Sequence, residues 1–491
     1  MVGRARLSAP REDRNEWPWH QAKWTALSAS LLTGGDRRME AENYLAGGYG
    51  LRLAMEARKD GWAHMERLAK VWQPNRLKGI QVGPEFGTPF LAATQVFDLR
   101  PAPRKWLSLD RTENAAERFV TNGTILVTCS GSVGRATLTH RPHENILISH
   151  DLLRVEPQRP GWWGWLYAFL RAPQTRAMMT AVRYGHMIKH LEVSHLNALP
   201  MPILRDELLT QFQDSAEKML AMRRRAFDLS IEAERLYNEC FPSLQYKNDV
   251  QVGYEISASE MLGGRRRLDG GFHVSSVKQI VAAFHRHAVE VVQLSSVVER
   301  VFVPGRFKHI YGDGGTPYLD SADILEVNPD IGKLVLSLTH EEQEEYRVTP
   351  GWILIPCSGQ VYGIIGHAVL ATEWHVGKVL SNHILRVCPR NSIRGGYLQC
   401  VLGHPKVGRP QLVRLAFGSS VPEIAGEDVA TVAVPRLSPN IENHLADMME
   451  ESAKARGIAD DLEKTLATDA ENLIDRFLSG NRSNFVRELV T

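Results

Sequence analysis

The sequence contains few cysteines and no long hydrophobic run, and each shortage excludes a class of protein. Its 491 residues include five cysteines, an odd number without a CxxC pair, which argues against a disulfide framework and against a zinc site. No run of 18 apolar residues occurs, so nothing in the sequence predicts a membrane-spanning helix. The basic N-terminal stretch lacks the apolar segment of a secretory signal. We therefore expect a cytoplasmic protein.

Signatures of catalysis and of strong charge are also missing. The sequence has no NPPY motif of amino-methyltransferases, no GxxxxGK[ST] loop of nucleotide hydrolases and no convincing nuclease carboxylate cluster. Lys and Arg number 58 and Asp and Glu number 56, which leaves a net charge of +2. Any affinity for a polyanion must then come from local basic patches. We predict no catalytic residue, no metal site and no cofactor in this chain.

What the sequence does contain is one stretch that occurs twice. Residues 120–133 read VTNGTILVTCSGSV and residues 348–361 read VTPGWILIPCSGQV, identical at nine of fourteen positions. Both carry a Cys-Ser-Gly tip, at 129–131 and at 357–359. Self-similarity at one long period indicates a duplicated domain and not a solenoid.

The repeat extends along most of the chain. Four further segments recur in the same order: residues 24–44 and 253–273, RLK at 76–78 and RFK at 306–308, TPFL at 88–91 and TPYL at 316–319, and SHDLLRV at 149–155 and SNHILRV at 381–387. Each copy ends at a proline-rich exit, which marks the end of a globular part. We therefore predict two globular domains, 24–204 and 253–437, after a lead-in over 1–23.

Within each copy the local patterns are mixed. Short β-branched runs bounded by Gly and Pro predict strands, as at 124–128 and 352–355. Residues 163–170 and 174–182 favour helix instead. The predicted fold class is therefore α+β, a mixed α/β domain without a regular βαβ repeat.

A long helix is predicted after each copy. Residues 206–238 contain no Gly or Pro, and apolar or small side chains recur at three-and-four spacing. A second such pattern follows Ser438-Pro439, which are an N-cap residue and a proline at the first helical position. We predict helices over 205–241 and 438–480, with a tail over 481–491. Because each carries an apolar seam, we expect an antiparallel coiled coil that relates the two domains by a pseudo-twofold axis.

The order of these elements resembles the specificity subunit of type I restriction-modification systems. Each copy has a TPFL or TPYL strand, a CSG hairpin, an SHDLLRV or SNHILRV strand, a glycine-marked loop, a proline exit and a long helix. The resemblance implies two target recognition domains that each read one half of a bipartite DNA sequence, separated by spacer helices. It implies a non-catalytic subunit that binds double-stranded DNA, two methyltransferase subunits and two restriction subunits. S-adenosylmethionine, ATP and magnesium would belong to those partners.

Candidate DNA-binding residues lie at equivalent places in the two copies. At the hairpin tips they are Ser130, Ser132, Arg135, Ser358, Gln360 and Tyr362, since Arg suits guanine and Gln suits adenine in the major groove. In the glycine-marked loops they are Arg183, Tyr184, His186, Lys189, Ser419 and Ser420. Arg76, Lys78, Arg306 and Lys308 open the copies and suit phosphate contacts. Tight turns and solvated basic faces are the alternative explanations.

Three other functions remain open. The same subunit would also serve a modification-only system, or a fused methyltransferase-nuclease. A protein-interaction scaffold would need no DNA at all. A stand-alone hydrolase would use Cys129 or His150, although a small apolar residue at a buried strand end is the simpler explanation for two equivalent cysteines.

Overall fold

The computed structural model describes residues 47–76, 78–182, 190–244, 255–262 and 266–488. The chain divides into two compact units. Unit 1 comprises Met1–Phe97, Pro101–Ala221 and Leu462–Thr491, and unit 2 comprises Asp98–Arg100 and Met222–Asp461. Each unit therefore contains one half of both long helices.

The first sheet of unit 1 has four antiparallel strands in the order β2-β9-β6-β7. Their bounds are Ala69–Trp72, Leu152–Pro157, Ile125–Thr128 and Ala136–Leu138. All four residues of β6 are buried. A strand that is covered on both faces does not alternate between apolar and polar side chains, which explains the continuous apolar run in its sequence. The predicted strand at 124–128 is thus β6, the centre of this sheet.

A second sheet and a short ribbon complete unit 1. The sheet has the order β3 (Gln81–Val82), β5 (Lys105–Leu107), β4 (Thr88–Leu91) and β8 (Leu147–Ile148), and β4 pairs with β8 in parallel. The ribbon joins β1 (Trp62–His64) to the proline exit, β10 (Pro200–Pro202). A buried apolar cluster that includes Leu91, Leu126 and Ile148 joins the two sheets.

Unit 2 repeats most of this topology, although its second sheet has three strands where that of unit 1 has four. Its first sheet has the order β12 (Val298–Phe302), β18 (Ile384–Pro389), β15 (Ile353–Pro356) and β16 (Val369–Leu370). The second has β14 (Leu334–Val335), β13 (Tyr311–Leu319) and β17 (Val379–Leu380), and the ribbon has β11 (Glu290–Gln293) and β19 (Ala433–Arg436). Leu126 faces Arg154 in unit 1, and Leu354 faces Arg386 in unit 2. The repeat in the sequence is therefore a repeat of strand order and register.

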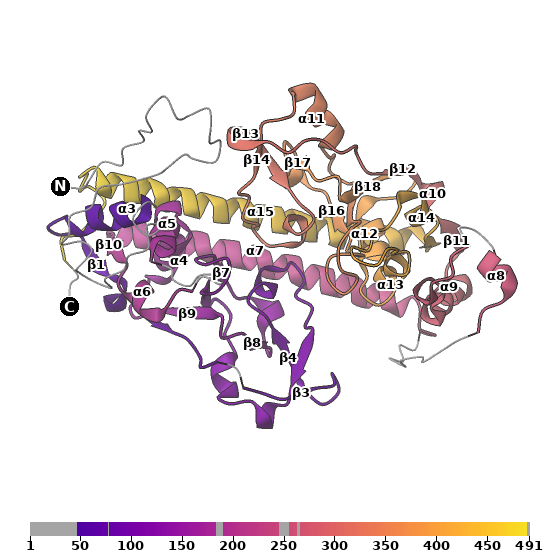
Figure 1. Cartoon of the computed structure of the whole chain (residues 1–491), viewed down its shortest axis with the longest axis horizontal. Coiled ribbons are helices and arrows are strands. Elements are labelled where there is room, and N and C mark those ends of the chain that lie inside the picture. The colour runs from indigo at the N-terminus through magenta and orange to yellow at the C-terminus, as the bar shows by residue number, and fades with distance from the viewer. Residues whose placement is uncertain (1–46, 77, 183–189, 245–254, 263–265, 489–491) are drawn as a thin grey trace, which may run out of the picture. The chain divides into compact units, whose positions relative to one another are not determined.

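Each unit also contains shorter helices (Figure 1). In unit 1 they are α3 (Gly47–Glu56), α4 (Trp163–Arg171), α5 (Pro173–Ala181) and α6 (Val193–Asn197). In unit 2 they are α8 (Ala258–Leu262), α9 (Ser275–His287), α10 (Leu294–Val297), α11 (His340–Tyr346), α12 (Gly395–Gly403), α13 (Gly408–Val413) and α14 (Gly426–Val429). The helices predicted at 163–170 and 174–182 are α4 and α5.

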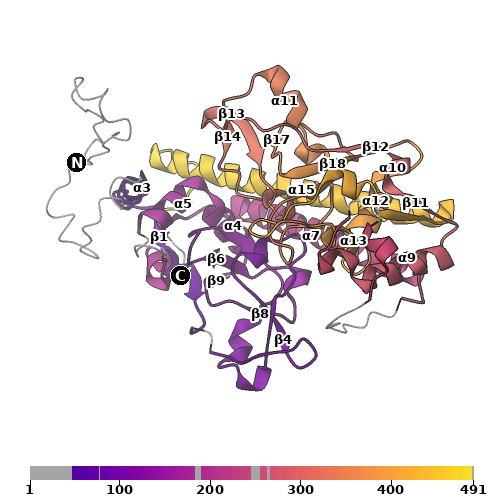
Figure 2. The ribbon, with the colours of Figure 1, turned by 45° about the vertical axis from the view of Figure 1, so that its right-hand side comes forward.

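The two long helices are α7 (Asp206–Glu239) and α15 (Pro439–Leu478), close to the predicted bounds. In unit 2 they run antiparallel, because Ser452 Oγ donates to the Ala226 carbonyl at 2.6 Å while Arg223, earlier in α7, lies 3.9 Å from Asp460, later in α15. Figures 1 and 2 show the helices side by side. The predicted antiparallel pairing is confirmed by these contacts.

Charged side chains are buried within the predicted apolar seam. Arg223 and Asp460 are 3% and 4% exposed in unit 2, and burial raises the pKa of the Asp460 carboxyl to about 6. In unit 1 the buried Glu463 accepts a hydrogen bond from the Tyr167 hydroxyl and lies 3.3 Å from Arg171 Nε. A buried charge without its partner is costly, so these pairs favour one register of each helix against its neighbours.

Two equivalent glycines allow a short helix to approach a long one closely. A Cβ on Gly164 of α4 would lie 2.4 Å from the Phe212 carbonyl carbon of α7, and a Cβ on Gly396 of α12 would lie 2.4 Å from the Ala446 carbonyl oxygen of α15. Real Cβ atoms do not come so near a backbone. Glycine at these positions therefore builds the same close crossing in each unit.

We expect Gly396→Ala to lower the free energy of unfolding by about 2 kcal/mol, because the added methyl group would force α12 away from α15. Gly457→Ala is the matched control. Its Cβ would lie 3.7 Å from Trp374 Cβ, an ordinary contact, and replacing a glycine inside a helix should raise the stability by roughly 0.5–1 kcal/mol. Urea unfolding curves measure both changes. Equal effects of the two substitutions would contradict the close crossing.

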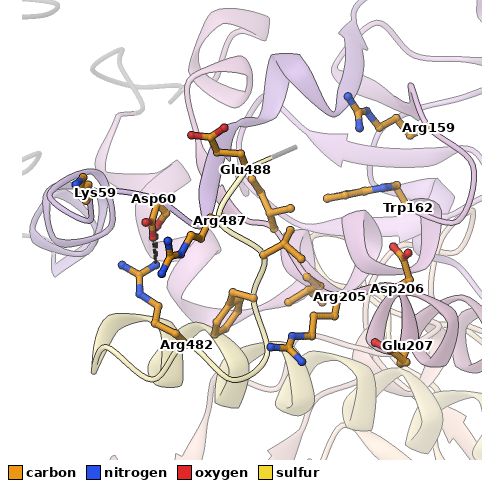
Figure 3. A pocket seen from close by; sticks show the side chains of 14 residues that line it. Lys59, Asp60, Arg159, Trp162, Arg205, Asp206, Glu207, Arg482, Arg487 and Glu488 are labelled. Atoms are coloured by element: carbon orange, nitrogen blue, oxygen red, sulfur yellow. Dashed lines mark hydrogen bonds and ion pairs between the residues drawn. The ribbon is translucent and has the colours of Figure 1, made fainter. Parts of the chain in front are cut away.

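The segment after α15 pairs with unit 1. Phe485 pairs antiparallel with Leu204, the Val486 N–H donates to the Ile203 carbonyl at 3.0 Å, and the Gly61 N–H donates to the Arg487 carbonyl at 2.9 Å. The same segment borders an open pocket of about 950 Å³, where Arg482 pairs with Asp60 (Figure 3). Part of the predicted tail over 481–491 therefore belongs to the fold of unit 1.

Candidate nucleic-acid interface

In unit 1 the CSG hairpin is fixed to the turn before β9. The Cys129 N–H donates to the Asp151 carbonyl at 3.1 Å, and the Asp151 N–H donates to Ser149 Oγ at 3.1 Å. Beneath this turn lies the fully buried Arg154. Its guanidinium donates to the carbonyls of Ile148 at 3.1 Å, Ser149 at 3.0 Å and Leu152. The side chains of Ser149 and Arg154 thus hold four backbone groups in and around this turn, one N–H and three carbonyls.

Unit 2 contains the same set of contacts. The Cys357 N–H donates to the His383 carbonyl at 2.9 Å, and the His383 N–H donates to Ser381 Oγ at 3.1 Å. The fully buried Arg386 donates to the carbonyls of Leu380 at 2.8 Å, Ser381 at 2.8 Å, Tyr346 at 3.2 Å and Ile384. Hairpin and turn therefore form one frame that is built in the same way in both units, with the Tyr346 carbonyl as an additional acceptor in unit 2.

A third segment completes the frame on the other side of the hairpin. The Leu191 N–H donates to the Cys129 carbonyl at 2.9 Å, and the Ile424 N–H donates to the Cys357 carbonyl at 2.7 Å. In unit 2 this segment closes a loop, because Phe417 and Glu423 exchange backbone hydrogen bonds of 2.9 and 2.8 Å. The predicted hairpin tip and glycine-marked loop of unit 2 are thus adjacent.

Most of the predicted DNA-binding residues lie at the surface. Arg76, Lys78, Ser132, Arg306, Lys308, Gln360, Tyr362, Ser419 and Ser420 are exposed, and Ser130, Arg135 and Ser358 are partly buried. Tyr362 of the hairpin is 64% exposed, and Phe417 and Val421 of the glycine-marked loop are 42% and 59% exposed. Arg183, Tyr184, His186 and Lys189 lie outside the described residues. Of the predicted residues that the structure describes, none lines the pocket of Figure 3.

Two of the predicted tip residues make contacts inside their unit. The guanidinium of Arg135 lies 4.0 Å from the ring centroid of Phe97, a cation–π distance. Ser358 Oγ lies 2.7 Å from His383 Nδ1. Whether either side chain contacts a base stays a prediction, but both are held in place by neighbours.

Basic side chains surround the frame of unit 1. Burial lowers the pKa of His150, and the charges of Arg118, Arg76 and Arg154 lower the pKa further, while Asp151 opposes them. Gln73 donates to the His150 carbonyl at 2.6 Å and so ties the strand that precedes Arg76 to the same turn. Arg76 is exposed near this turn, and an exposed arginine suits contact with a phosphate.

The two equivalent cysteines are packing residues of the frame. Burial raises the pKa of the Cys129 thiol to about 12 and that of the Cys357 thiol to about 11. Cys129 Sγ contacts the His150 carbonyl at 3.8 Å and Gln73 Nε2 at 3.3 Å. A thiol with a raised pKa is a poor nucleophile. This geometry counts against a stand-alone hydrolase that uses Cys129.

We expect alkylation of Cys129 in the native protein at pH 8 to be about 1000-fold slower than alkylation of free cysteine, because so little thiolate is present. Mass mapping of iodoacetamide-labelled peptides measures the rate, and the same protein in guanidinium serves as control. A native rate close to that of free cysteine would point to an activated thiol and would reopen the hydrolase hypothesis.

Four residues of the frame are not among the residues predicted from the sequence. Arg154 and Arg386 belong to the repeated LRV segment, and their identity in both copies was the available signal. Asp151 and His383 occupy equivalent positions in that segment but differ in kind. They are considered below.

Metal and membrane functions find no support among the described residues. Within those ranges no group of three or more His, Cys, Asp or Glu side chains is placed to hold a metal ion. None of the helices there combines the length and the apolar composition that crossing a bilayer requires.

The fold and the frame define a duplicated mixed α/β protein in which two similar units share two long helices. The chain is similar, over most of its length, to solved specificity subunits of type I restriction-modification systems. The S subunit from M. genitalium is 14% identical, with 88% of this chain and 98% of that chain covered and a TM-score of 0.34. The HsdS subunit from Thermoanaerobacter tengcongensis is 12% identical, with 86% and 96% covered and a TM-score of 0.26.

A third structure, described as showing complex assembly and conformational transition of the type I R-M system, is 13% identical, with 86% of this chain and 97% of that chain covered and a TM-score of 0.26. No family model matches the chain, and no curated protein matches it.

Proposed function

We propose that this chain is the specificity subunit of a type I restriction-modification complex, which reads a bipartite sequence in double-stranded DNA. The observation that carries the proposal is the frame that is built twice, with the same register and the same buried arginine, while the exposed residues at its tips differ. A shared frame with different tips suits two related sites of different sequence. DNA offers such sites at a fixed spacing.

The exposed charges support DNA as the target. Arg76 and Lys78 in unit 1 and Arg306 and Lys308 in unit 2 are all exposed at equivalent positions. Phosphates are common to every half-site, so residues that bind them should be the same in both units. Residues that read bases should differ, as Ser132 and Gln360 do.

The proposal includes partners that perform the chemistry. Methyltransferase subunits, two in number, would dock along α7 and α15, and two restriction subunits would join through them. S-adenosylmethionine, ATP and magnesium would be bound by those subunits. The specificity subunit itself would be non-catalytic, which agrees with the raised pKa values of its two frame cysteines.

The test is a selection from randomised DNA with the methyltransferase subunits present. We expect a bipartite sequence to be enriched, and log affinity to fall steeply with log salt because phosphate contacts release counterions. Cys129→Ser and Cys357→Ser should leave the selected sequence unchanged. Enrichment of no bipartite sequence would exclude the proposal and favour a protein-interaction scaffold.

A further inference from the structure

One position of the frame holds a different side chain in each unit. The residue whose carbonyl accepts the N–H of the tip cysteine is Asp151 in unit 1 and His383 in unit 2. In both units its own N–H donates to the serine two residues earlier at 3.1 Å. The backbone at this position is therefore fixed by the same bonds, and only the side chain is free to vary.

The Asp151 side chain is available at the surface of unit 1. It is 42% exposed, and its contacts are with its own turn. Ser149 Oγ donates to Asp151 Oδ2 at 3.1 Å, and His150 Nε2 lies 3.6 Å from Asp151 Oδ1. Apart from His150, no basic side chain is paired with this carboxylate among the described residues. A carboxylate held in this way can only accept hydrogen bonds.

The His383 side chain occupies the same place in unit 2 and is held by the hairpin tip. Its Nδ1 lies 2.7 Å from Ser358 Oγ, and Ser358 also pairs with Glu423 of the neighbouring loop. The ring is partly exposed, and its Nε2 has no protein partner in the described part of the chain. In the tautomer whose Nδ1 accepts from the Ser358 hydroxyl, Nε2 carries a proton that it can donate.

We propose that Asp151 and His383 are specificity-determining residues, each reading a base in the half-site of its own unit. The inference rests on the proposed function and names a part of its mechanism. An acceptor at Asp151 suits the amino group of cytosine, since carboxylates accept from cytosine N4 in the major groove. A donor at His383 suits guanine, whose N7 and O6 are both acceptors. The same backbone geometry would thus present a hydrogen-bond acceptor in unit 1 and a hydrogen-bond donor in unit 2.

A role in stability alone explains the two residues less well. A residue needed for the fold should be the same in two copies that share the fold, as the buried Arg154 and Arg386 are. Asp151 and His383 are instead partly exposed and different. Neither side chain bonds to the core of its sheet in the contacts described above.

The experiment exchanges the two side chains in the complete complex with methyltransferase subunits. Asp151→His and His383→Asp are each compared with the unsubstituted protein by selection from a randomised duplex pool. We expect Asp151→His to change the preference at one base pair of one half-site by roughly ten-fold to a hundred-fold, and to leave the other half-site unchanged. His383→Asp should do the same in the opposite half-site.

Controls separate reading from folding. His340→Asp makes the same exchange at an exposed residue of α11 in unit 2 and should change neither half-site. Asp151→Asn and His383→Gln introduce side chains close in size to the original ones, so they can be tested where an exchanged variant does not assemble. Both substitutions should weaken the preference at the same base pairs. Unchanged half-sites in all substituted complexes would overturn the inference while the proposed function stands. No bipartite selection by the unsubstituted complex would overturn both.

Discussion

Replacing Arg386 with methionine should destabilise unit 2 by about 3 kcal/mol. The substitution removes the donor to four buried carbonyls, those of Tyr346, Leu380, Ser381 and Ile384, and each carbonyl left without a partner costs roughly 1–3 kcal/mol. An opposing gain arises because burial lowers the pKa of Arg386 to about 10. Methionine carries no charge, so the substitution also removes the cost of burying the cation, which adds roughly 3 kcal/mol to the stability. The loss of several carbonyl partners should exceed this gain.

The measurement is urea unfolding combined with hydrogen exchange of backbone amides, so that the weakened region is located. Exchange should rise in the turn before β18 and in the CSG hairpin of unit 2, since both are tied to Arg386. Arg300→Met is the matched control, because Arg300 is exposed on the neighbouring strand β12 and stacks on Phe302 at 3.8 Å. We expect that control to cost less than 1 kcal/mol, roughly the value of an exposed cation–π contact. Equal losses in both variants would show that the carbonyl contacts of Arg386 contribute little.

The repeat and the long helices could be predicted because their signals are local. Three-and-four spacing without Gly or Pro locates α7, and Ser438-Pro439 locates the start of α15, to within a residue or two. The apolar run at 125–127 predicts a buried strand, which is β6. Such patterns depend on the side chains of one element and need no knowledge of its neighbours.

Other features depend on contacts far along the chain. Arg154 and Arg386 look like surface residues in the sequence, since arginine is almost never fully buried without a partner. Their partners are backbone carbonyls of a nearby turn, and no residue type reveals those. The segment around Phe485 is a further example, because its pairing with Leu204 joins residues at a separation that periodicity cannot show.

The same reasoning applies to the region that carries the candidate site, whose DNA-binding role stays a prediction. The hairpin tips were found because their sequences repeat, and the structure shows the unit 2 tip beside the loop that carries Ser419 and Ser420. Asp151 and His383 are not among the predicted residues, because the segment in which they lie predicts a strand of the shared fold. The residues that differ between copies inside an otherwise shared segment are the better signal for base reading.

Lengthening both long helices by one heptad should change the gap between the half-sites and leave the half-sites themselves unchanged. Unit 1 contains α7 up to Ala221 and α15 from Leu462, and unit 2 contains the rest of both helices. Seven residues inserted after Ala221 and seven after Asp461 would therefore leave the contacts within each unit intact. A heptad also keeps the seam residues on the same face of each helix.

The expected change is an increase of about three base pairs, because seven residues add about 10 Å of helix and a base pair occupies 3.4 Å. Selection from randomised DNA with the methyltransferase subunits measures it. Insertion into α7 alone is the informative control: it shifts α7 against α15 and separates pairs such as Arg225 and Glu451, which lie 3.1 Å apart, so it should reduce stability and not simply widen the gap. A gap that stays the same after the double insertion would show that the helices do not set the distance between the half-sites.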